Sequence, residues 1–256
     1  MTEVKIQIMT PLPHQVGALD SPKRFKVLRW GRRRGKTRTG FRAATRGHGS
    51  LPNGKGFLEG GEILWIVRDY KNATTVWRKE ILFRFANKGG FKINLQDMRV
   101  VFEANSGSLT IVSAENIDSV RGGDWDGVVI DEAAHMKLHD VWLDVIRPGL
   151  VDRIGWCLMM STTKPGSWFN ELCESVMDGK RKSWGHWHGT ARENPKIDPQ
   201  EFDDMVDEYD DEVKLQCEVF AELVVPGGLA FSEWQTDLHV YEWEPPITWN
   251  WVASLD

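Results

Sequence analysis

A seven-residue loop rich in glycine and arginine constrains this 256-residue chain more than any other feature. The loop, Gly31–Thr37, has the sequence GRRRGKT; it follows a predicted strand over Phe25–Trp30 and opens a predicted helix over Lys36–Thr45. Loops of this kind turn backbone N–H groups toward an anion and place a helix N-terminus behind it. Their lysine reaches the β- and γ-phosphates of a nucleotide, and their hydroxyl binds Mg²⁺. The loop therefore predicts a binding site for a nucleoside triphosphate.

The spacing of the loop departs from the common GxxxxGK[ST] pattern. Trp30 stands at the position of the first glycine, and Gly31 lies one place closer to the second. Gly35, Lys36 and Thr37 keep the residues that carry the chemistry. Because a chance Gly-Lys-Thr is common, the prediction depends on the strand before the loop, the helix after it and the acidic strand described below.

Three consecutive arginines, Arg32, Arg33 and Arg34, lie inside the loop. Arginine stabilises triphosphate charge during phosphoryl transfer, although one or two of the three could simply face solvent. We expect at least one of them to contact the nucleotide, and we predict catalytic roles for Arg32 and Lys36. Arg38, in the first turn of the predicted helix, is a further candidate for nucleotide binding.

An apolar strand that ends in paired acids, Val128–Glu132, supplies the second half of the predicted site. We expect Asp131, at the strand tip, to hold Mg²⁺ through water beside Thr37, and Glu132 to polarise the attacking water as general base. Alone, the pair could be a solvated acidic turn after a buried strand. Together with the phosphate loop, the adjacent glutamate favours a hydrolase or motor over a kinase, whose nucleophile is a substrate hydroxyl.

Four further residues complete the predicted site. Gln15, before the first strand, is our candidate for the adenine edge, because its amide offers both a donor and an acceptor. Thr162 and Thr163, at the end of a later strand, could hydrogen-bond the γ-phosphate or form an ordinary turn. Arg121, in a loop just before the acidic strand, could be a solvated turn residue or reach the γ-phosphate of a neighbouring subunit.

Short β-rich runs alternate with longer helical patterns along the chain. This order predicts an α/β fold with a central, mainly parallel sheet flanked by helices. The other predicted strands are Ile63–Val67, Leu109–Val112 and Trp156–Ser161, and the other predicted helices are Thr74–Phe85, Leu138–Ile146 and Trp168–Met177. Met98–Val112 reads as a hairpin, Gly47–Gly61 as a surface loop, and the region from about Pro199 to Phe220 as acidic helices.

Charge is distributed unevenly, although the net charge is only −5. Eleven Lys or Arg and no acid lie between Ser21 and Arg46, whereas ten acids and one lysine lie between Glu201 and Glu222. We expect one basic surface to meet an anion while the acidic helices face solvent, or both runs to be merely solvated. The three cysteines form no CxxC pair, which argues against a disulfide framework or a classical zinc site. The absence of a long apolar run or a secretion signal predicts a cytoplasmic protein without a membrane span.

These residues together resemble the large terminase subunits of tailed bacteriophages, specifically their N-terminal ATPase domain, over essentially the whole chain. Gly31–Thr37 is similar to the family's shortened, arginine-bearing Walker A motif, and Val128–Glu132 to its Walker B motif with the catalytic glutamate. Ser161–Lys164 resembles its coupling motif and Gln15 its adenine motif. Arg121 matches the position of its trans-acting arginine finger.

The resemblance implies a P-loop NTPase of the ASCE type with a small C-terminal helical lid subdomain. We expect the ATPase core over residues 1–190, the lid and linker over 191–226, and a linker with the truncated start of an RNase H-like nuclease over 227–256. Val252–Asp256 looks like the first nuclease strand. Because the remaining nuclease carboxylates are absent, we expect no DNA cleavage from this chain.

The implied activity is ATP hydrolysis, with ATP and Mg²⁺ as cofactors, that drives viral double-stranded DNA into a procapsid in the host cytoplasm. The implied partners are DNA, the portal protein, the small terminase subunit and further copies of the chain in a ring, expected to be a pentamer, with no membrane. Two alternatives stay open. One is a helicase-like P-loop ATPase, since Asp131–His135 reads DEAAH, although the residues after Thr163 are too few for a second RecA lobe. The other is a nucleotide-gated assembly module without turnover.

Overall fold

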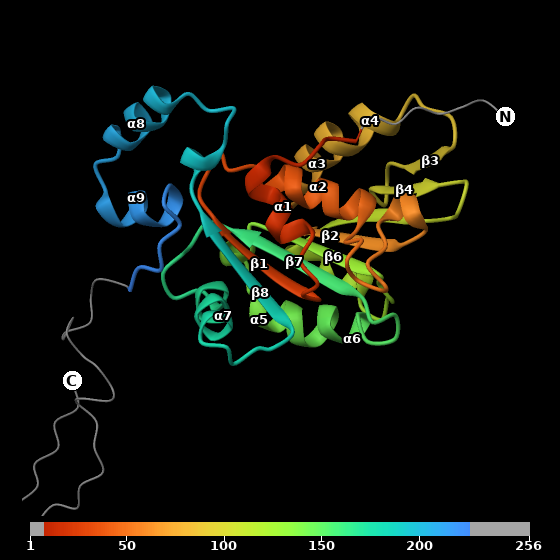
Figure 1. The fold of residues 1–256 in the computed structure, drawn as a ribbon. Helices are drawn as coiled ribbons and strands as arrows, with labels where there is room; N and C mark the ends of the chain where they lie inside the picture. Colours follow the sequence, from red (N-terminus) through yellow and green to blue (C-terminus); the bar gives the residue numbers. More distant parts are fainter. Residues whose placement is uncertain (1–7, 226–256) are drawn as a thin grey trace, which may run out of the picture. The chain divides into compact units, whose positions relative to one another are not determined.

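An eight-stranded mixed sheet forms the centre of the computed structural model, which describes residues 8–225 (Figure 1). The strand order is β3-β4-β5-β2-β6-β7-β1-β8; β3 and β4 pair antiparallel with each other and β4 with β5, and the other pairs are parallel. The strands are β1 Phe25–Trp30, β2 Glu62–Val67, β3 Phe91–Asn94, β4 Arg99–Phe102, β5 Ser108–Ser113, β6 Gly127–Asp131, β7 Trp156–Ser161 and β8 Trp184–Gly189.

Helices cover both faces of the sheet, with α1 to α4 on one face and α5 to α7 on the other (Figure 1). The helices are α1 Pro13–Leu19, α2 Lys36–Arg46, α3 Tyr70–Val76, α4 Phe83–Phe85, α5 Leu138–Val141, α6 Arg147–Gly149, α7 Trp168–Met177, α8 Pro199–Asp207 and α9 Glu212–Glu218. The π-helical segments η2 Trp77–Leu82 and η5 Trp142–Ile146 join α3 to α4 and α5 to α6. The 3₁₀ segments are η1 Phe57–Glu59, η3 Ala114–Val120, η4 Ala133–His135 and η6 Ala191–Glu193.

The central strands are buried on both faces, which explains why their sequences are mostly apolar; the charged residues of β1, Lys26 and Arg29, are buried as well. Every residue of β1, β6 and β7 is buried. Alternate residues of one strand enter different apolar clusters: Leu28 and Trp30 pack beneath α2 and α3, whereas Phe25 and Val27 pack against α5 to α7. A parallel sheet covered on both sides requires this pattern.

The predicted elements of the sheet are found, with differences at their edges. The predicted hairpin is β4–β5, closed by a hydrogen bond from the Phe102 N–H to the Gly107 carbonyl (2.8 Å). β3 pairs onto this hairpin and was not predicted, because its short sequence alternates exposed and half-buried residues. The predicted Thr74–Phe85 helix begins earlier, at Tyr70, because Asp69 caps it by accepting the N–H of Asn72 (2.9 Å).

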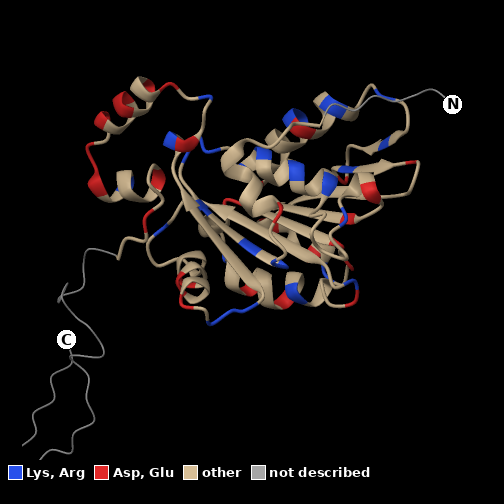
Figure 2. Cartoon of the chain, in the orientation of Figure 1, with Lys and Arg blue, Asp and Glu red and all other residues tan. Residues whose placement is uncertain are grey.

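The acidic helices α8 and α9 lie beside the carboxyl end of β8 and bury a small apolar cluster of their own (Figure 1). The cluster consists of Ala191, Phe202, Leu215 and Val219. Acidic residues, coloured red on the cartoon, concentrate on these two helices in Figure 2, and most of the acidic run is exposed to solvent as predicted. The described residues up to Val224 belong to one compact unit. The predicted start of a nuclease, 227–256, lies outside the described residues.

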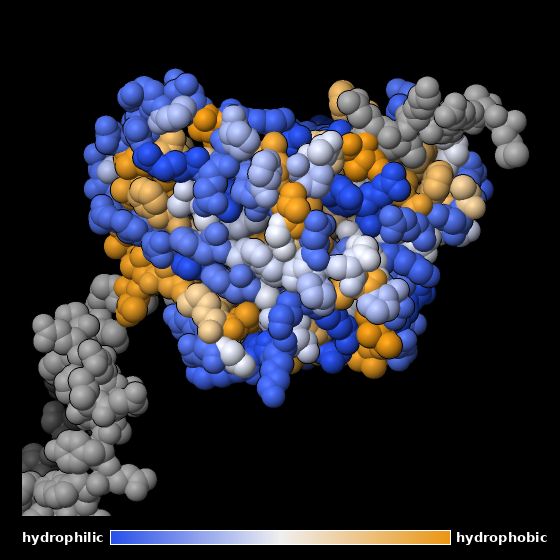
Figure 3. Space-filling view, in the orientation of Figure 1, coloured by the Kyte–Doolittle hydropathy of each residue, from blue (hydrophilic) through white to orange (hydrophobic). Residues whose placement is uncertain are grey.

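The basic run does not form the single surface that its sequence suggested. Four of its cations, Lys26, Arg29, Arg34 and Lys36, are buried and make specific contacts. The face of the described chain seen in Figure 3 is mostly hydrophilic, with apolar side chains in scattered patches. Within residues 8–225, no helix has the length and apolar character needed to cross a bilayer.

Candidate functional site

The phosphate loop joins β1 to α2 at the carboxyl edge of the sheet, where ligands of open α/β sheets bind. Its turn needs two left-handed backbone conformations, at Arg33 (φ 64°) and at Gly35 (φ 93°). Gly35 precedes the first residue of α2, so the loop delivers the helix N-terminus and its free N–H groups to the site. The sequence-predicted phosphate loop therefore has the geometry that anion binding requires.

Lys36 is buried under this loop and folds back onto it. Its Nζ donates to the carbonyl oxygens of Trp30 (3.0 Å) and Gly31 (3.2 Å). Burial lowers the pKa of Lys36 from its ordinary value, and the charges of Glu132 and Asp131 oppose this change. Because burial disfavours the charged form of Lys36, a phosphate bound at the loop would stabilise its ammonium group.

The tip of β6 brings a carboxylate to the first turn of α2. The Thr37 hydroxyl donates to Asp131 Oδ2 (3.0 Å), so these two residues lie together as predicted. Burial, and secondarily the charge of Glu132, raise the pKa of Asp131 to about 6. A hydroxyl and one carboxylate fit Mg²⁺, which prefers oxygen ligands and keeps several waters. The described residues hold no cluster of three or more His, Cys, Asp or Glu that would form an all-protein metal cage.

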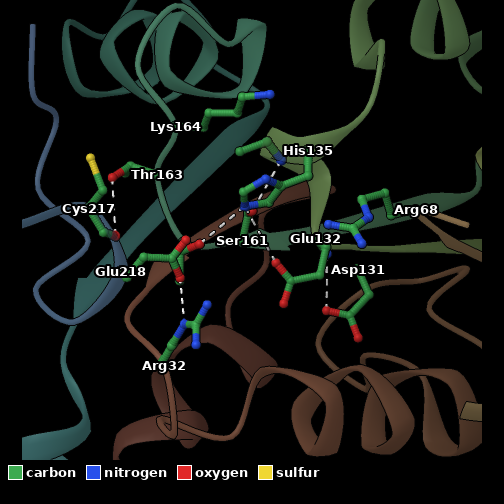
Figure 4. Close-up of polar contacts among 12 residues, drawn as sticks. Arg32, Arg68, Asp131, Glu132, His135, Ser161, Thr163, Lys164, Cys217 and Glu218 are labelled. Atoms are coloured by element: carbon green, nitrogen blue, oxygen red, sulfur yellow. Dashed lines mark hydrogen bonds and ion pairs between the residues drawn. The ribbon is translucent and has the colours of Figure 1, made fainter. Parts of the chain in front are cut away.

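Glu132 leaves the strand in an unusual conformation. Its φ is 57°, a left-handed value that is costly for a non-glycine residue, and its N–H donates to Asp131 Oδ1 (3.1 Å). The following turn is anchored by the Ala134 N–H, which donates to Ser161 Oγ (3.1 Å). This turn separates the two acids, so that the Glu132 carboxylate lies nearer His135 (3.9 Å) and apart from that of Asp131 (Figure 4).

The residues at the end of β7 divide between the site and the C-terminal segment. Thr162 Oγ1 lies 3.5 Å from His135 Nε2, on the side of Glu132. Thr163 instead donates its hydroxyl to the carbonyl of Glu222 (2.6 Å). Ser161, the first residue of the predicted coupling motif, accepts the Ala134 N–H and so contacts the turn that follows Glu132.

The three loop arginines point in different directions. Arg34 is buried over the Trp30 ring and pairs with Glu193, so its guanidinium is directed toward η6. The Arg33 side chain is exposed, while its carbonyl accepts from Asn194. Arg32 Nε donates to Glu218 Oε2 at 2.6 Å (Figure 4).

The last residue of α9 and the short segment that follows it, residues 218–222, lie directly on the phosphate loop, and we call this stretch the strap. The Arg32 N–H donates to the Glu218 carbonyl (2.7 Å), and a Cβ atom at Gly31 would overlap the carbonyl oxygen of Val219. Arg29, on β1, donates to the Ala221 carbonyl (2.7 Å). The strap therefore covers one side of the loop and is fixed to the strand that carries it.

Gln15 and Arg38 flank the loop on the α1 side. The Gln15 amide caps its own helix by accepting the Leu12 N–H (2.9 Å) and lies 3.4 Å from the Gly35 carbonyl. Arg38 lines a hollow of about 690 Å³, together with Leu12 and Lys196. The hollow is large enough for a nucleoside and begins two residues along α2 from Lys36.

Arg121 is not brought to this loop. It is exposed, follows η3 and pairs with Asp118 (2.9 Å) in a surface turn. Its turn follows β5, which three strands separate from β1. Within its own chain it therefore lies away from Lys36 and Glu132.

A smaller hollow of about 310 Å³ opens beside Thr37 and Asp131, the predicted metal ligands. Thr37, Asp131 and Glu132 form one of its sides, and Arg68 and Lys79 belong to its other lining residues. Arg68 was not predicted as a site residue. It lies directly after β2, which pairs with the acidic strand β6, and this pairing is visible only in the structure.

Comparisons with known proteins agree on one family. No family model matches the sequence. The large terminase subunit of Escherichia phage T5 is 30% identical over 190 residues, which cover 72% of this chain and 40% of that protein. The chain thus spans less than half of that relative's length.

Solved structures show the same fold. The large terminase ATPase domain of Thermus phage P74-26 matches with a TM-score of 0.61 over 84% of this chain and 94% of that one, at 20% identity. The large terminase of another thermophilic bacteriophage, in complex with ADP, matches with a TM-score of 0.60 over 91% of this chain and 58% of that one, at 16% identity. The same terminase has also been solved with ATPγS. The predicted α/β fold with a central, mainly parallel sheet flanked by helices is confirmed, and it is the fold of that ATPase domain.

Proposed function

Because the chain belongs to the large terminase family and has the fold of its ATPase domain, we propose that it hydrolyses ATP to drive viral double-stranded DNA into a procapsid. The observation that carries the proposal is the convergence of Lys36, Thr37, Asp131 and Glu132 at one edge of the sheet. ADP and ATPγS, which are bound in the structures of the thermophilic-phage terminase, are the ligands that this edge would take.

The phosphate loop binds the triphosphate through its N–H groups and Lys36. The base and ribose enter the hollow beside Arg38, and Gln15 supports the loop from the α1 side. Thr37 and Asp131 would hold Mg²⁺, which supplies charge neutralisation for the β- and γ-phosphates. Arg32 reaches the phosphates once it leaves Glu218, whereas Arg33 and Arg34 act through the shape of the loop.

Glu132 acts as the general base. Its backbone conformation separates its carboxylate from that of Asp131, so it can accept a proton from water while Asp131 serves the metal. Thr162, beside His135, lies on the same side and would sense the γ-phosphate. Thr163 would carry that change to the strap through Glu222.

Arg121 serves a neighbouring copy of the chain. An exposed arginine away from its own nucleotide site fits a residue that completes the site of the next subunit in a ring. Such a ring, expected to be a pentamer on the portal protein, would also engage DNA and the small terminase subunit in the host cytoplasm.

The deciding measurement is ATP turnover with Mg²⁺, with and without double-stranded DNA and portal. Wild-type protein should hydrolyse ATP, and Lys36→Ala should lose nucleotide binding. Glu132→Ala should keep binding and lose turnover by about 100-fold or more. Wild-type protein that binds ATP without measurable turnover, with Glu132→Ala behaving in the same way, would indicate a nucleotide-gated assembly module in place of an ATPase.

A further inference from the structure

Arg68 leaves its strand at the same level at which Glu132 leaves the acidic strand. β2 and β6 pair in parallel register, with Ile66 opposite Ile130. Two residues further along each strand are Arg68 and Glu132. Figure 4 shows the Arg68 guanidinium directed toward the Glu132 and Asp131 side chains.

The two residues share a hollow with the metal-binding pair. Arg68, Glu132, Asp131 and Thr37 all line the same 310 Å³ space. Arg68 also lines the neighbouring hollow that contains His135. Burial lowers the pKa of that histidine, and the positive charge of Arg68 adds to this change. A cation in this position faces the space where a γ-phosphate bound by Lys36 and Thr37 would end.

The Arg68 guanidinium is held at one end and available at the other. Its Nε donates to Asp69 Oδ2 (2.9 Å), and its side chain is half exposed. Asp69 is itself fixed, because it caps α3 by accepting the Asn72 N–H (2.9 Å). Among residues 8–225, the Nη groups of Arg68 have no hydrogen-bond partner, so they can bind phosphate oxygens without breaking an existing bond.

The other arginines near the loop are less suited to this role. Arg34 is buried against Glu193, and Arg32 is engaged by Glu218 on the opposite side of the loop. Arg121 lies away from its own site. Arg68 is therefore the arginine that the fold places beside the general base within one subunit.

We propose that Arg68 is a further catalytic residue of this site, a cis-acting arginine that contacts the γ-phosphoryl group and stabilises the charge of its transition state. This inference rests on the proposed ATPase function. In the step concerned, a water oxygen bonds to the γ-phosphorus as its proton passes to Glu132. The bond from phosphorus to the β,γ-bridging oxygen breaks, and its electron pair leaves with ADP. Arg68 stabilises the equatorial oxygens of the transferred group, where preorganised donors lower the barrier most.

The test compares Arg68→Ala and Arg68→Lys with the matched control Lys71→Ala. Lys71 is an exposed cation three residues along the chain that does not line the hollow. We expect Arg68→Ala to lower kcat by about 100-fold or more while KM changes by less than about threefold. We expect Arg68→Lys to recover part of the rate, because lysine keeps the positive charge but lacks the planar set of N–H donors of a guanidinium group. We expect Lys71→Ala to match wild type.

A second readout separates catalysis from structure. Arg68→Ala should weaken binding of ADP with aluminium fluoride, which mimics the transferred phosphoryl group, and leave ADP binding and the melting temperature unchanged. Equal turnover in Arg68→Ala and Lys71→Ala overturns the inference and leaves the ATPase proposal intact. A loss of turnover that follows a lower melting temperature or weaker ADP binding also overturns it. If the wild-type protein hydrolyses no ATP, the proposed ATPase function itself is wrong.

Discussion

Glu218 and Arg32 form an ion pair of 2.6 Å across the phosphate loop, and the Glu218 side chain is only 16% exposed. The carboxylate raises the pKa of Arg32 through this hydrogen bond, and its charge also acts on the buried Lys36. Glu218 thus presents a negative charge to two cations that a triphosphate would bind. The strap supplies an internal anion at the edge of the nucleotide site (Figure 4).

Removing that charge should strengthen nucleotide binding. Glu218→Gln keeps the size of the side chain and frees Arg32 for phosphate, so we expect ADP and ATPγS to bind about threefold to tenfold more tightly. The matched control is Glu212→Gln, an exposed acid on the same helix that bonds Gln216. Calorimetric titration of both variants measures the effect. Equal affinities in the two variants would show that Glu218 does not compete with the nucleotide.

The close approach of the strap to Gly31 predicts a second effect. A Cβ atom at this position would overlap the Val219 carbonyl, so Gly31→Ala should displace the strap. We expect faster amide hydrogen exchange over residues 218–222 and a loss of about 1–3 kcal/mol in the free energy of unfolding. Gly49→Ala is the control, because a Cβ atom there meets no other atom within 4 Å. Unchanged exchange at the strap in Gly31→Ala would rule out this coupling.

The parts of the site that the sequence predicts are those with local signals. The acidic strand is a run of apolar residues that ends in two acids, and the Gly35-Lys36-Thr37 turn has its own composition, so the two halves of the site could be placed at the carboxyl ends of two strands. In the sheet, β7 lies between these two strands. Their proximity, 3.0 Å between Thr37 Oγ1 and Asp131 Oδ2, follows from parallel strand topology.

The contacts that the sequence could not predict join residues far apart in the chain. Arg32 meets Glu218 across 186 positions, and Arg34 meets Glu193 across 159. No periodicity or spacing encodes such pairs, because they depend on where α9 and η6 pack against the sheet. Arg68 was missed for a related reason: its importance comes from the register of β2 against β6, which a single sequence does not reveal.

Ser161 provides a test of how the general base is positioned. Its hydroxyl accepts the N–H of Ala134 and so anchors the strained turn that follows Glu132. Ser161→Ala leaves a buried N–H without its partner, and we expect a loss of about 1–2 kcal/mol in the free energy of unfolding. We also expect kcat to fall about tenfold with ATP affinity unchanged, measured by steady-state kinetics and nucleotide titration. A wild-type kcat in the variant would show that this anchor does not position Glu132.

A further prediction concerns the stability of the protein and depends on Lys26, near the start of β1 and far along the strand from the phosphate loop. It is fully buried on β1, where its Nζ lies 2.9 Å from His48 Nδ1 and 3.3 Å from the Leu19 carbonyl. Burial lowers the pKa of Lys26 to about 7, and the charge of Asp20 opposes this only partly. The ammonium form is therefore costly in the folded protein and not in the unfolded chain, where the lysine keeps its ordinary pKa of 10.5.

The sign of the resulting pH dependence follows from proton linkage. Between pH 7 and 10.5 the unfolded chain holds a proton on Lys26 that the folded protein has released, so this residue makes stability rise with pH across that window. Lys26→Met removes the effect. We expect the variant to be about 1–3 kcal/mol more stable than wild type at pH 6.5, and the difference to shrink by pH 9.5. Urea unfolding at both pH values measures it, with exposed Lys71→Met as the control. A difference that is the same at both pH values would mean that Lys26 keeps its proton in the folded protein.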